Sequence, residues 1–310
     1  MSVVQFRDLK AVRLFLNLGI DLKKCEKSDP PILQRAAKNR CTEVLDYLLS
    51  RRILDPSNAD ENTVTALYVA AESVNPRAME LLLEAGAKVD PVNHRDGFTP
   101  LHQALSLATV RWYSSKIEDE IAHCIELLLS YGADVEAEMY GGNELETSED
   151  GGVVQYRLDY SKICGAPLKV LLSHVNLLLS QGRRVDTKLY QEMKNYDEAC
   201  QNELETLKTE ILGEPVSLYH VLTGGFCKFY TRYSGVMQNI QDCEHVSKLK
   251  DRFPIYGRRV VKYIDHQILM EKAAGKLSRL LGLQKECFHL IIEKIILMLH
   301  KRDMQVLSIL

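Results

Sequence analysis

The feature that most constrains the fold of this chain is a leucine that returns at a fixed interval. Leu33, Leu67 and Leu101 stand 34 residues apart, in the stretches PILQRAA, TALYVAA and TPLHQAL. Leu168, in GAPLKVL, follows Leu101 by 67 residues, which is close to two periods. Internal repetition at this period indicates a solenoid, in which each unit buries its apolar face only against its neighbours.

The second half of each unit repeats as well, as a leucine-rich helix end followed by a cap residue. Glycine suits the cap, because a left-handed backbone costs glycine little. An aspartate then opens a turn into the next unit, at Asp90, Asp134 and Asp186. The cap positions are Gly19, Arg52, Gly86, Gly132 and Gly182.

The stretch DGFTPLHQA explains what the first half of a unit requires. We expect Thr99 to cap the first helix and to pair with the imidazole of His102. Pro100 fits the first helical turn, where a missing N–H costs nothing. Leu101 is expected to face the core between units, and the small Ala104 lets the two antiparallel helices approach closely. This assignment gives His102 a structural rather than a catalytic role.

By these residues the first part of the chain resembles ankyrin repeats. We therefore expect an all-α protein with about four and a half such units over residues 1–187. Residues 1 to about 22 are expected to supply only a second helix. The first helix of the last unit is expected to be truncated, because its spacer is short. Atypical terminal units are usual in a solenoid, since they cap its core.

Two insertions interrupt the period, near residues 105–120 and 138–163. The first adds twelve residues to the third unit and carries Trp112, the one tryptophan, beside Tyr113. Either both helices of that unit are longer and pack on one another, or the insertion projects an aromatic contact surface, since Trp and Tyr are enriched at binding hot spots. The second insertion is acidic and glycine-rich, which predicts a loop.

The resemblance to ankyrin repeats also implies where a partner binds. Proteins of this kind present turn tips and first-helix faces along a concave surface. We expect some residues of that surface to contact a target protein, whose identity the sequence does not give. These residues are Asn58, Asp60, Asn62, Tyr68, His94, Arg95, Gln103, Ser106, Trp112 and Tyr113.

Composition and motifs favour a binding protein over an enzyme. The formal net charge of −3 gives no reason to expect nucleic acid or a membrane as partner, and no segment approaches a membrane span. Phosphate-loop, GxSxG and HExxH motifs are absent and the Cys–His pairs lack zinc spacing, so we expect no catalytic, cofactor or metal site. Eight scattered cysteines without a CxxC pair indicate reduced thiols, in the cytoplasm or alternatively the nucleus.

Residues 188–310 lose the period and predict a separate helical domain. A helix is expected over residues 188–212, ended by Gly213 and Pro215. Further on, FPIYG predicts a Pro–Gly turn ahead of another helix. The last segment, CFHLIIEKIILMLHKRDMQVLSIL, has a wide apolar stripe, and its spacing resembles the start of an F-box, with Cys-Phe in place of the usual Leu-Pro. The alternative is a core helix that seals its own domain.

Ankyrin repeats, a helical domain with FPIYG and a truncated F-box-like terminus together resemble the ankyrin proteins with a PRANC domain found in poxviruses, parasitoid wasps and bacterial endosymbionts. The resemblance implies a host–pathogen adaptor whose terminus recruits a Skp-type adaptor and a cullin ubiquitin ligase. The alternative is a stand-alone ankyrin binder or inhibitor, for example of an immune transcription factor, with a purely structural C-terminal domain. The residues implied in cullin-adaptor binding are Ile291, Ile295, Ile296, Leu299, Asp303, Met304 and Leu307.

Overall fold

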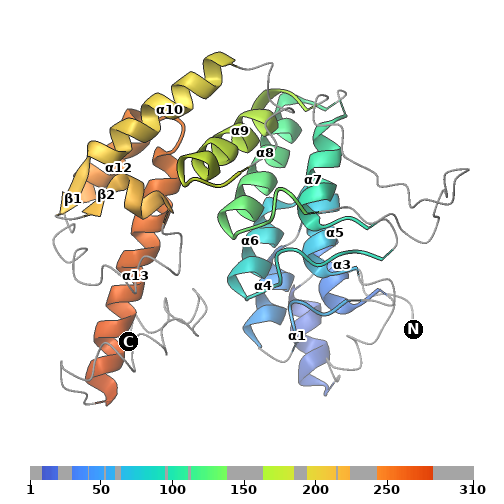
Figure 1. The fold of residues 1–310 in the computed structure, drawn as a ribbon. Coiled ribbons are helices and arrows are strands. Elements are labelled where there is room, and N and C mark those ends of the chain that lie inside the picture. Colours follow the sequence, from blue (N-terminus) through green and yellow to red (C-terminus); the bar gives the residue numbers. More distant parts are fainter. Residues whose placement is uncertain are drawn as a thin grey trace, which may run out of the picture. The chain divides into compact units, whose positions relative to one another are not determined.

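The structure is a computed structural model, and its description covers eleven segments of the chain. Within these segments the fold is all-α apart from one short hairpin, which confirms the expected fold class (Figure 1). The chain divides into two compact units, Met1–Leu171 and Leu172–Leu310, which are described separately. The domain boundary expected at residue 187 stays a prediction. The described segments are residues 9–19, 30–40, 42–51, 54–59, 64–94, 97–110, 113–137, 163–184, 194–213, 216–223 and 243–281.

The first unit is a stack of helix pairs. The first helices α3, α5 and α7 pack side by side in one row, and the second helices α4, α6 and α8 pack behind them with α1 at the end (Figure 1). This arrangement confirms the predicted solenoid. The helices are α1 (Leu9–Asn17), α3 (Ile32–Lys38), α4 (Thr42–Ser50), α5 (Ala66–Glu72), α6 (Pro76–Glu84), α7 (Pro100–Ala108) and α8 (Ser115–Ser130), followed by the start of α9 (Gly165–Ser180).

The repeating leucines form the core between the helix pairs, as predicted. Leu33, Leu67 and Leu101 are at most 2% exposed, one on each first helix. Ala104 on α7 is also buried, as is Ala70 at the matching place on α5. Small side chains at this position let two helices approach closely, and the full burial of the leucines is the main source of stability in such a stack.

The start of α7 has the predicted cap. The Thr99 hydroxyl oxygen accepts the His102 backbone N–H at 3.3 Å, and the Thr99 backbone N–H donates to Nδ1 of His102 at 3.2 Å. These reciprocal bonds form a capping box, in which His102 occupies the place usually taken by Glu or Gln. His102 is 2% exposed, so its role is structural, as expected from the sequence.

The second helices end on glycines in the left-handed region. After α6, the Ala87 N–H donates to the Leu82 carbonyl across Gly86, which has a φ of 89°. After α8, the Ala133 N–H donates to the Leu128 carbonyl across Gly132 in the same way. Gly19 and Gly182 also have positive φ, so the caps predicted at all four glycines are confirmed, while Arg52 lies outside the described residues.

The first insertion mainly lengthens one helix. α8 has 16 residues, whereas α6, its counterpart in the preceding unit, has 9. The added residues form the connection that follows α7 and the first turns of α8. The last repeat differs more from the expected pattern. Its α9 runs without a break from Gly165 to Ser180, so the expected short first helix is not separate and merges with the second helix.

The described part of the second unit packs helices and a short hairpin around one apolar core, to which the end of α9 contributes Leu177. A helix predicted over residues 188–212 is found as α10 (Lys194–Thr209), but its predicted end instead forms the strand β1 (Ile211–Gly213). β1 pairs antiparallel with β2 (Val216–Ser217), and a further helix begins at residue 218. Then follow α12 (Cys243–Arg252) and α13 (Gly257–Leu281).

The FPIYG stretch is the turn between α12 and α13, as predicted, and it is held from three sides. Phe253 and Tyr256 are buried, and the Tyr256 hydroxyl donates to the Ser173 carbonyl at 2.8 Å. The Glu203 carboxylate on α10 accepts the Tyr256 backbone N–H at 2.7 Å. A Cβ on Gly257 would overlap the carbonyl oxygen of Leu249, so the turn closes at a point where only glycine fits. The motif therefore has a structural role in this unit.

A cap like that of α7 recurs in the second unit. The Ser217 backbone N–H donates to Nδ1 of His220 at 3.1 Å, and the Ser217 hydroxyl lies 2.8 Å from the same nitrogen. The His220 backbone N–H donates back to that hydroxyl at 3.4 Å. The spacing and the bonds match those of Thr99 and His102, so residues 217–220 start a helix by the same device as the repeats.

Candidate target-binding surface

The first helices are held in register by hydrogen bonds between successive units. The Gln34 side chain donates to the Val64 carbonyl at 2.6 Å, and the Tyr68 hydroxyl donates to the Gln103 side chain at 3.0 Å. The Asn75 amide caps α6 and also donates to the Ala37 carbonyl of the preceding unit at 3.0 Å. Buried polar groups that are paired in this way fix one arrangement of neighbours, so the row of first helices forms a continuous and ordered surface.

The turns at one edge of that row project into solvent. The turn before α7 closes through the Asn93 N–H, which donates to the Phe98 carbonyl at 2.9 Å, and Asn93 itself is buried. The next residue, His94, is exposed at the tip. In the preceding turn the Ser57 hydroxyl accepts the Lys88 N–H at 2.9 Å, which ties two turns together. The turn tips are therefore presented by a fixed base.

The predicted target-binding residues differ in what they offer to a partner. His94 and Tyr113 are exposed, and Asn58, Gln103 and Ser106 are half-buried at turns and on α7. Tyr68 is only 5% exposed and is engaged with Gln103, which leaves it little area for a partner. The place of Tyr68 on a first helix was predicted, but its hydrogen bond to Gln103 in the next repeat was not. The predicted residues outside the described segments are Asp60, Asn62, Arg95 and Trp112.

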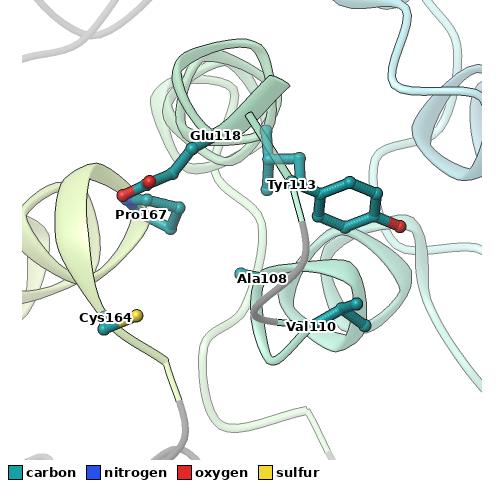
Figure 2. A pocket seen from close by; sticks show the side chains of 7 residues that line it. Ala108, Val110, Tyr113, Glu118, Cys164 and Pro167 are labelled. Carbon is teal, nitrogen blue, oxygen red and sulfur yellow. The ribbon is translucent and has the colours of Figure 1, made fainter. Parts of the chain in front are cut away.

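A pocket of about 360 Å³ lies where α7 ends, and sequence reasoning did not find it. We call it the third-unit pocket. Figure 2 shows Tyr113 and Val110 on one side, Glu118 and Pro167 on the other, and Ala108 between them. The signal in the sequence was the insertion itself, which moves the start of α8 away from the end of α7. All of its lining residues belong to the compact part Met1–Leu171. They are Ala108, Val110, Tyr113, Glu118, Ile121, Cys164 and Pro167.

Burial shifts the pKa of several side chains in the solenoid, including that of the Cys124 thiol, which is raised to about 12. Burial lowers the pKa of His102 below 6.5, and the nearby Ala137 backbone and Asp134 only partly oppose this shift. Burial raises the pKa of Asp90 above 3.8, although its carboxylate accepts the Asp134 backbone N–H at 3.1 Å. The second oxygen of Asp90 is buried without a hydrogen-bond partner. The fold therefore disfavours the charged forms of both His102 and Asp90.

The described residues contain no group of three His, Cys, Asp or Glu placed to hold a metal ion. In the same part of the chain, no helix has both the length and the apolar character that a membrane span requires. The arrangement is that of a scaffold: paired helices with an ordered row of turn tips and a pocket at the end of α7.

Comparison with known families agrees with this geometry. The family described as ankyrin repeats (3 copies) matches residues 1–93 and 51–139. Residues 1–139 carry ankyrin repeats. These ankyrin repeats imply protein–protein interaction, because the ankyrin fold is a scaffold whose stacked units present an extended binding surface. Ankyrin scaffolds are generally not enzymes.

Curated relatives share the ankyrin region. The chain is 29% identical over 143 residues to the mouse B-cell lymphoma 3 protein homolog, which covers 45% of this chain and 29% of that protein. It is 39% identical over 72 residues to rat cortactin-binding protein 2, covering 23% of this chain and 4% of the relative. It is also 33% identical over 111 residues to human BCL-6 corepressor-like protein 1, covering 36% and 6%. The chain thus spans less than a third of the length of these relatives.

Among solved structures, the human ASB11 ankyrin repeat domain aligns with 57% of this chain and 66% of its own, with a TM-score of 0.31 and 19% identity. The residues predicted to bind a cullin adaptor, from Ile291 to Leu307, lie outside the described segments. The family match ends at residue 139 and does not extend to the C-terminal segment.

Proposed function

We propose that this protein is an interaction adaptor: the ankyrin repeats hold a target protein, and the C-terminal segment recruits a Skp-type adaptor and a cullin ubiquitin ligase. The observation that carries the first half is the ordered row of turn tips and first helices. Inward residues such as Gln34 and Asn75 fix the row, while His94 at a turn tip and Ser106 on α7 remain accessible. A rigid base with accessible tips is suited to binding because little ordering entropy is lost on association.

Support for the second half comes from the sequence of the last segment. Ile291, Ile295 and Leu299 recur every four residues, and Met304 and Leu307 continue the stripe after a polar turn. An apolar stripe of this width must be buried against some surface, and a helix laid in the groove of a partner would bury it. Each fully buried aliphatic side chain contributes roughly 1.5–3 kcal/mol, so a few anchors suffice for micromolar binding.

The target-binding half is tested by substitutions on the turn tips of the full chain. We expect Arg95→Glu and Trp112→Ala to weaken binding of the target without lowering the melting temperature. Arg77→Glu on α6 is the control, because Arg77 is an exposed residue of the second-helix row and forms an ion pair with Glu80 on the same helix. If all three variants bind the target as well as the unchanged chain, the binding surface has been placed on the wrong residues.

The ligase half is tested with purified Skp-type adaptor and cullin. We expect both to bind the full chain and to bind neither a chain ending at Lys285 nor the full-length variant Leu307→Glu. The target should be retained by all three proteins, which separates loss of recruitment from loss of folding. Absence of binding to the full chain would leave a stand-alone ankyrin binder as the function.

A further inference from the structure

The third-unit pocket is built around one carboxylate. Oε1 of Glu118 accepts the Ala166 backbone N–H at 3.0 Å, so this side chain of α8 caps the first turn of α9. The two helices meet closely here, because a Cβ on Gly165 would overlap the same oxygen. A cap of this kind fixes the carboxylate in one orientation. Figure 2 shows it reaching across to Pro167 at the edge of the pocket.

The charge of that carboxylate is not balanced by a cation in the pocket. Glu118 is the one carboxylate among the described lining residues, and none of them is Lys, Arg or His. Within the described residues, Oε2 of Glu118 accepts no hydrogen bond, whereas Oε1 is occupied by Ala166. A half-buried carboxylate with one oxygen still available favours a cationic donor, because charge-assisted hydrogen bonds are about twice as strong as neutral ones.

The rest of the lining suits the stem of a long basic side chain. Ala108, Val110, Ile121 and Pro167 offer apolar atoms, and Tyr113 offers an aromatic ring that is 37% exposed. Lysine and arginine bury their aliphatic stems on apolar surfaces while the charged end reaches a polar group. A guanidinium group also stacks on tyrosine rings. The third-unit pocket therefore combines an apolar floor, an aromatic wall and a single anionic end.

We propose that the third-unit pocket receives a lysine or arginine side chain of the target protein, so that the repeats recognise a basic segment. This inference rests on the proposed target binding and specifies its chemistry. The pocket lies beside α7, within the same unit as the turn tips, so an extended segment bound along the first helices would reach it. An acidic or purely apolar side chain would leave the Glu118 carboxylate repelled or unpaired, which disfavours both.

Cys164 allows this preference to be measured without the target. Its thiol is exposed and lines the pocket, whereas Cys124 and Cys200 are buried. The full chain is equilibrated at a fixed thiol concentration with disulfide probes of equal length that end in a guanidinium, a urea or a carboxylate. Peptide-resolved mass spectrometry then gives the fraction of Cys164 labelled by each probe, and unlabelled Cys124 and Cys200 show that the chain remains folded.

We expect the guanidinium probe to label Cys164 about two- to fivefold more than the urea probe, as for an exposed charge pair. Glu118→Gln keeps an oxygen for Ala166 and should abolish the difference. Asp119→Asn removes the same charge from an exposed neighbour outside the pocket and should preserve it. Tyr113→Ala should reduce labelling by the guanidinium probe more than by the urea probe.

Equal labelling by the three probes, or a preference that persists in Glu118→Gln, would overturn the inference. Because no target is present, this result is independent of the proposed function. A preference for the guanidinium probe in a chain that binds no target would support the pocket and contradict the proposed function instead.

Discussion

At the scale of single residues, polar side chains of the solenoid form hydrogen bonds that link neighbouring repeats. Asn75 caps its own helix and donates to the preceding unit, and Tyr68 donates to Gln103 of the following one. Asp90 makes a similar link by accepting the Asp134 N–H, but it does so with a charged group whose other oxygen is buried without a partner. This link carries an electrostatic cost that a neutral side chain would avoid.

We expect Asp90→Asn to stabilise the first unit at neutral pH by up to ~1 kcal/mol, because the amide keeps an acceptor for Asp134 without a buried charge. The pKa of Asp90 is raised above 3.8, so the folded protein holds this proton more tightly than the unfolded chain, and the stability contributed by Asp90 falls as the pH rises through that range. The gain should therefore be seen in thermal unfolding at pH 7 and shrink near pH 4. Asp119→Asn, at an exposed site, is the control; a lower melting temperature for Asp90→Asn would contradict the argument.

At the scale of elements, the sequence predicted the helices of the repeats. It did not reveal the strand and the helix cap that form only through contact with a distant segment of the chain. The buried Leu33, Leu67 and Leu101, the Thr99–His102 cap and the glycine caps follow from period and local chemistry and were found as predicted, whereas Leu168 is only half-buried. The short strand β1 was predicted as helix, because Ile211 and Leu212 have good helix propensity and only pairing with β2 reveals the strand. The cap that Glu118 provides to α9 joins residues 48 positions apart, and no local pattern indicates such a contact.

The turn between α12 and α13 offers a test at this scale, because α13 contains two glycines in contrasting places. Gly257→Ala should destabilise the second unit by about 2–3 kcal/mol, since the new Cβ overlaps the Leu249 carbonyl. Gly275→Ala meets no atom within 4 Å and should instead stabilise the helix by roughly 0.5–1 kcal/mol.

Denaturant unfolding of the full chain gives both values, and hydrogen exchange over residues 243–281 assigns them to this unit. Equal effects of the two substitutions would show that the FPIYG turn tolerates a side chain at its last position. Each variant is a control for the other, because both replace glycine with alanine in the same helix.

At the scale of the whole molecule, each unit contains a histidine that the fold keeps neutral. His102 is part of the capping box of α7, and burial lowers its pKa below 6.5. In the second unit, burial lowers the pKa of His174 to about 3, with the guanidinium groups of Arg259 and Arg183 adding to the shift. Both histidines gain protons more readily in the unfolded chain than in the folded protein.

We therefore expect the free energy of unfolding to fall as the pH drops below 6.5. Between 6.5 and the folded-state pKa, the unfolded state binds more protons, so acid favours unfolding; for His174 this window extends down to about pH 3. Asp90 and Glu203, whose pKa values are raised, act in the opposite direction at the acid end. Unfolding measured from pH 7.5 to 4.5 should show the decline, and His174→Gln should reduce it.

His94→Gln, at an exposed turn tip, serves as the control. If the stability of the unchanged chain is constant over that range, then neither histidine is held neutral by the fold. The ankyrin repeats were predictable from period alone, whereas the lowered pKa values of these histidines were not, because they depend on which side chains pack around each imidazole.

The hydrogen-bonded links between units have a consequence for how such a chain changes over evolution. The groups that hold one unit to the next, such as Asn75 and the Thr99–His102 box, are buried, while His94 at a turn tip is exposed to solvent. If the proposed binding surface is correct, a substitution at a tip therefore alters the surface offered to a target while leaving the buried links between units in place. Tyr68 and Gln103 belong both to the proposed binding surface and to the links between units, whereas the exposed tips can vary with less effect on the stack, so a lineage can exchange one target for another by small steps at the tips, without passing through an unfolded ancestor.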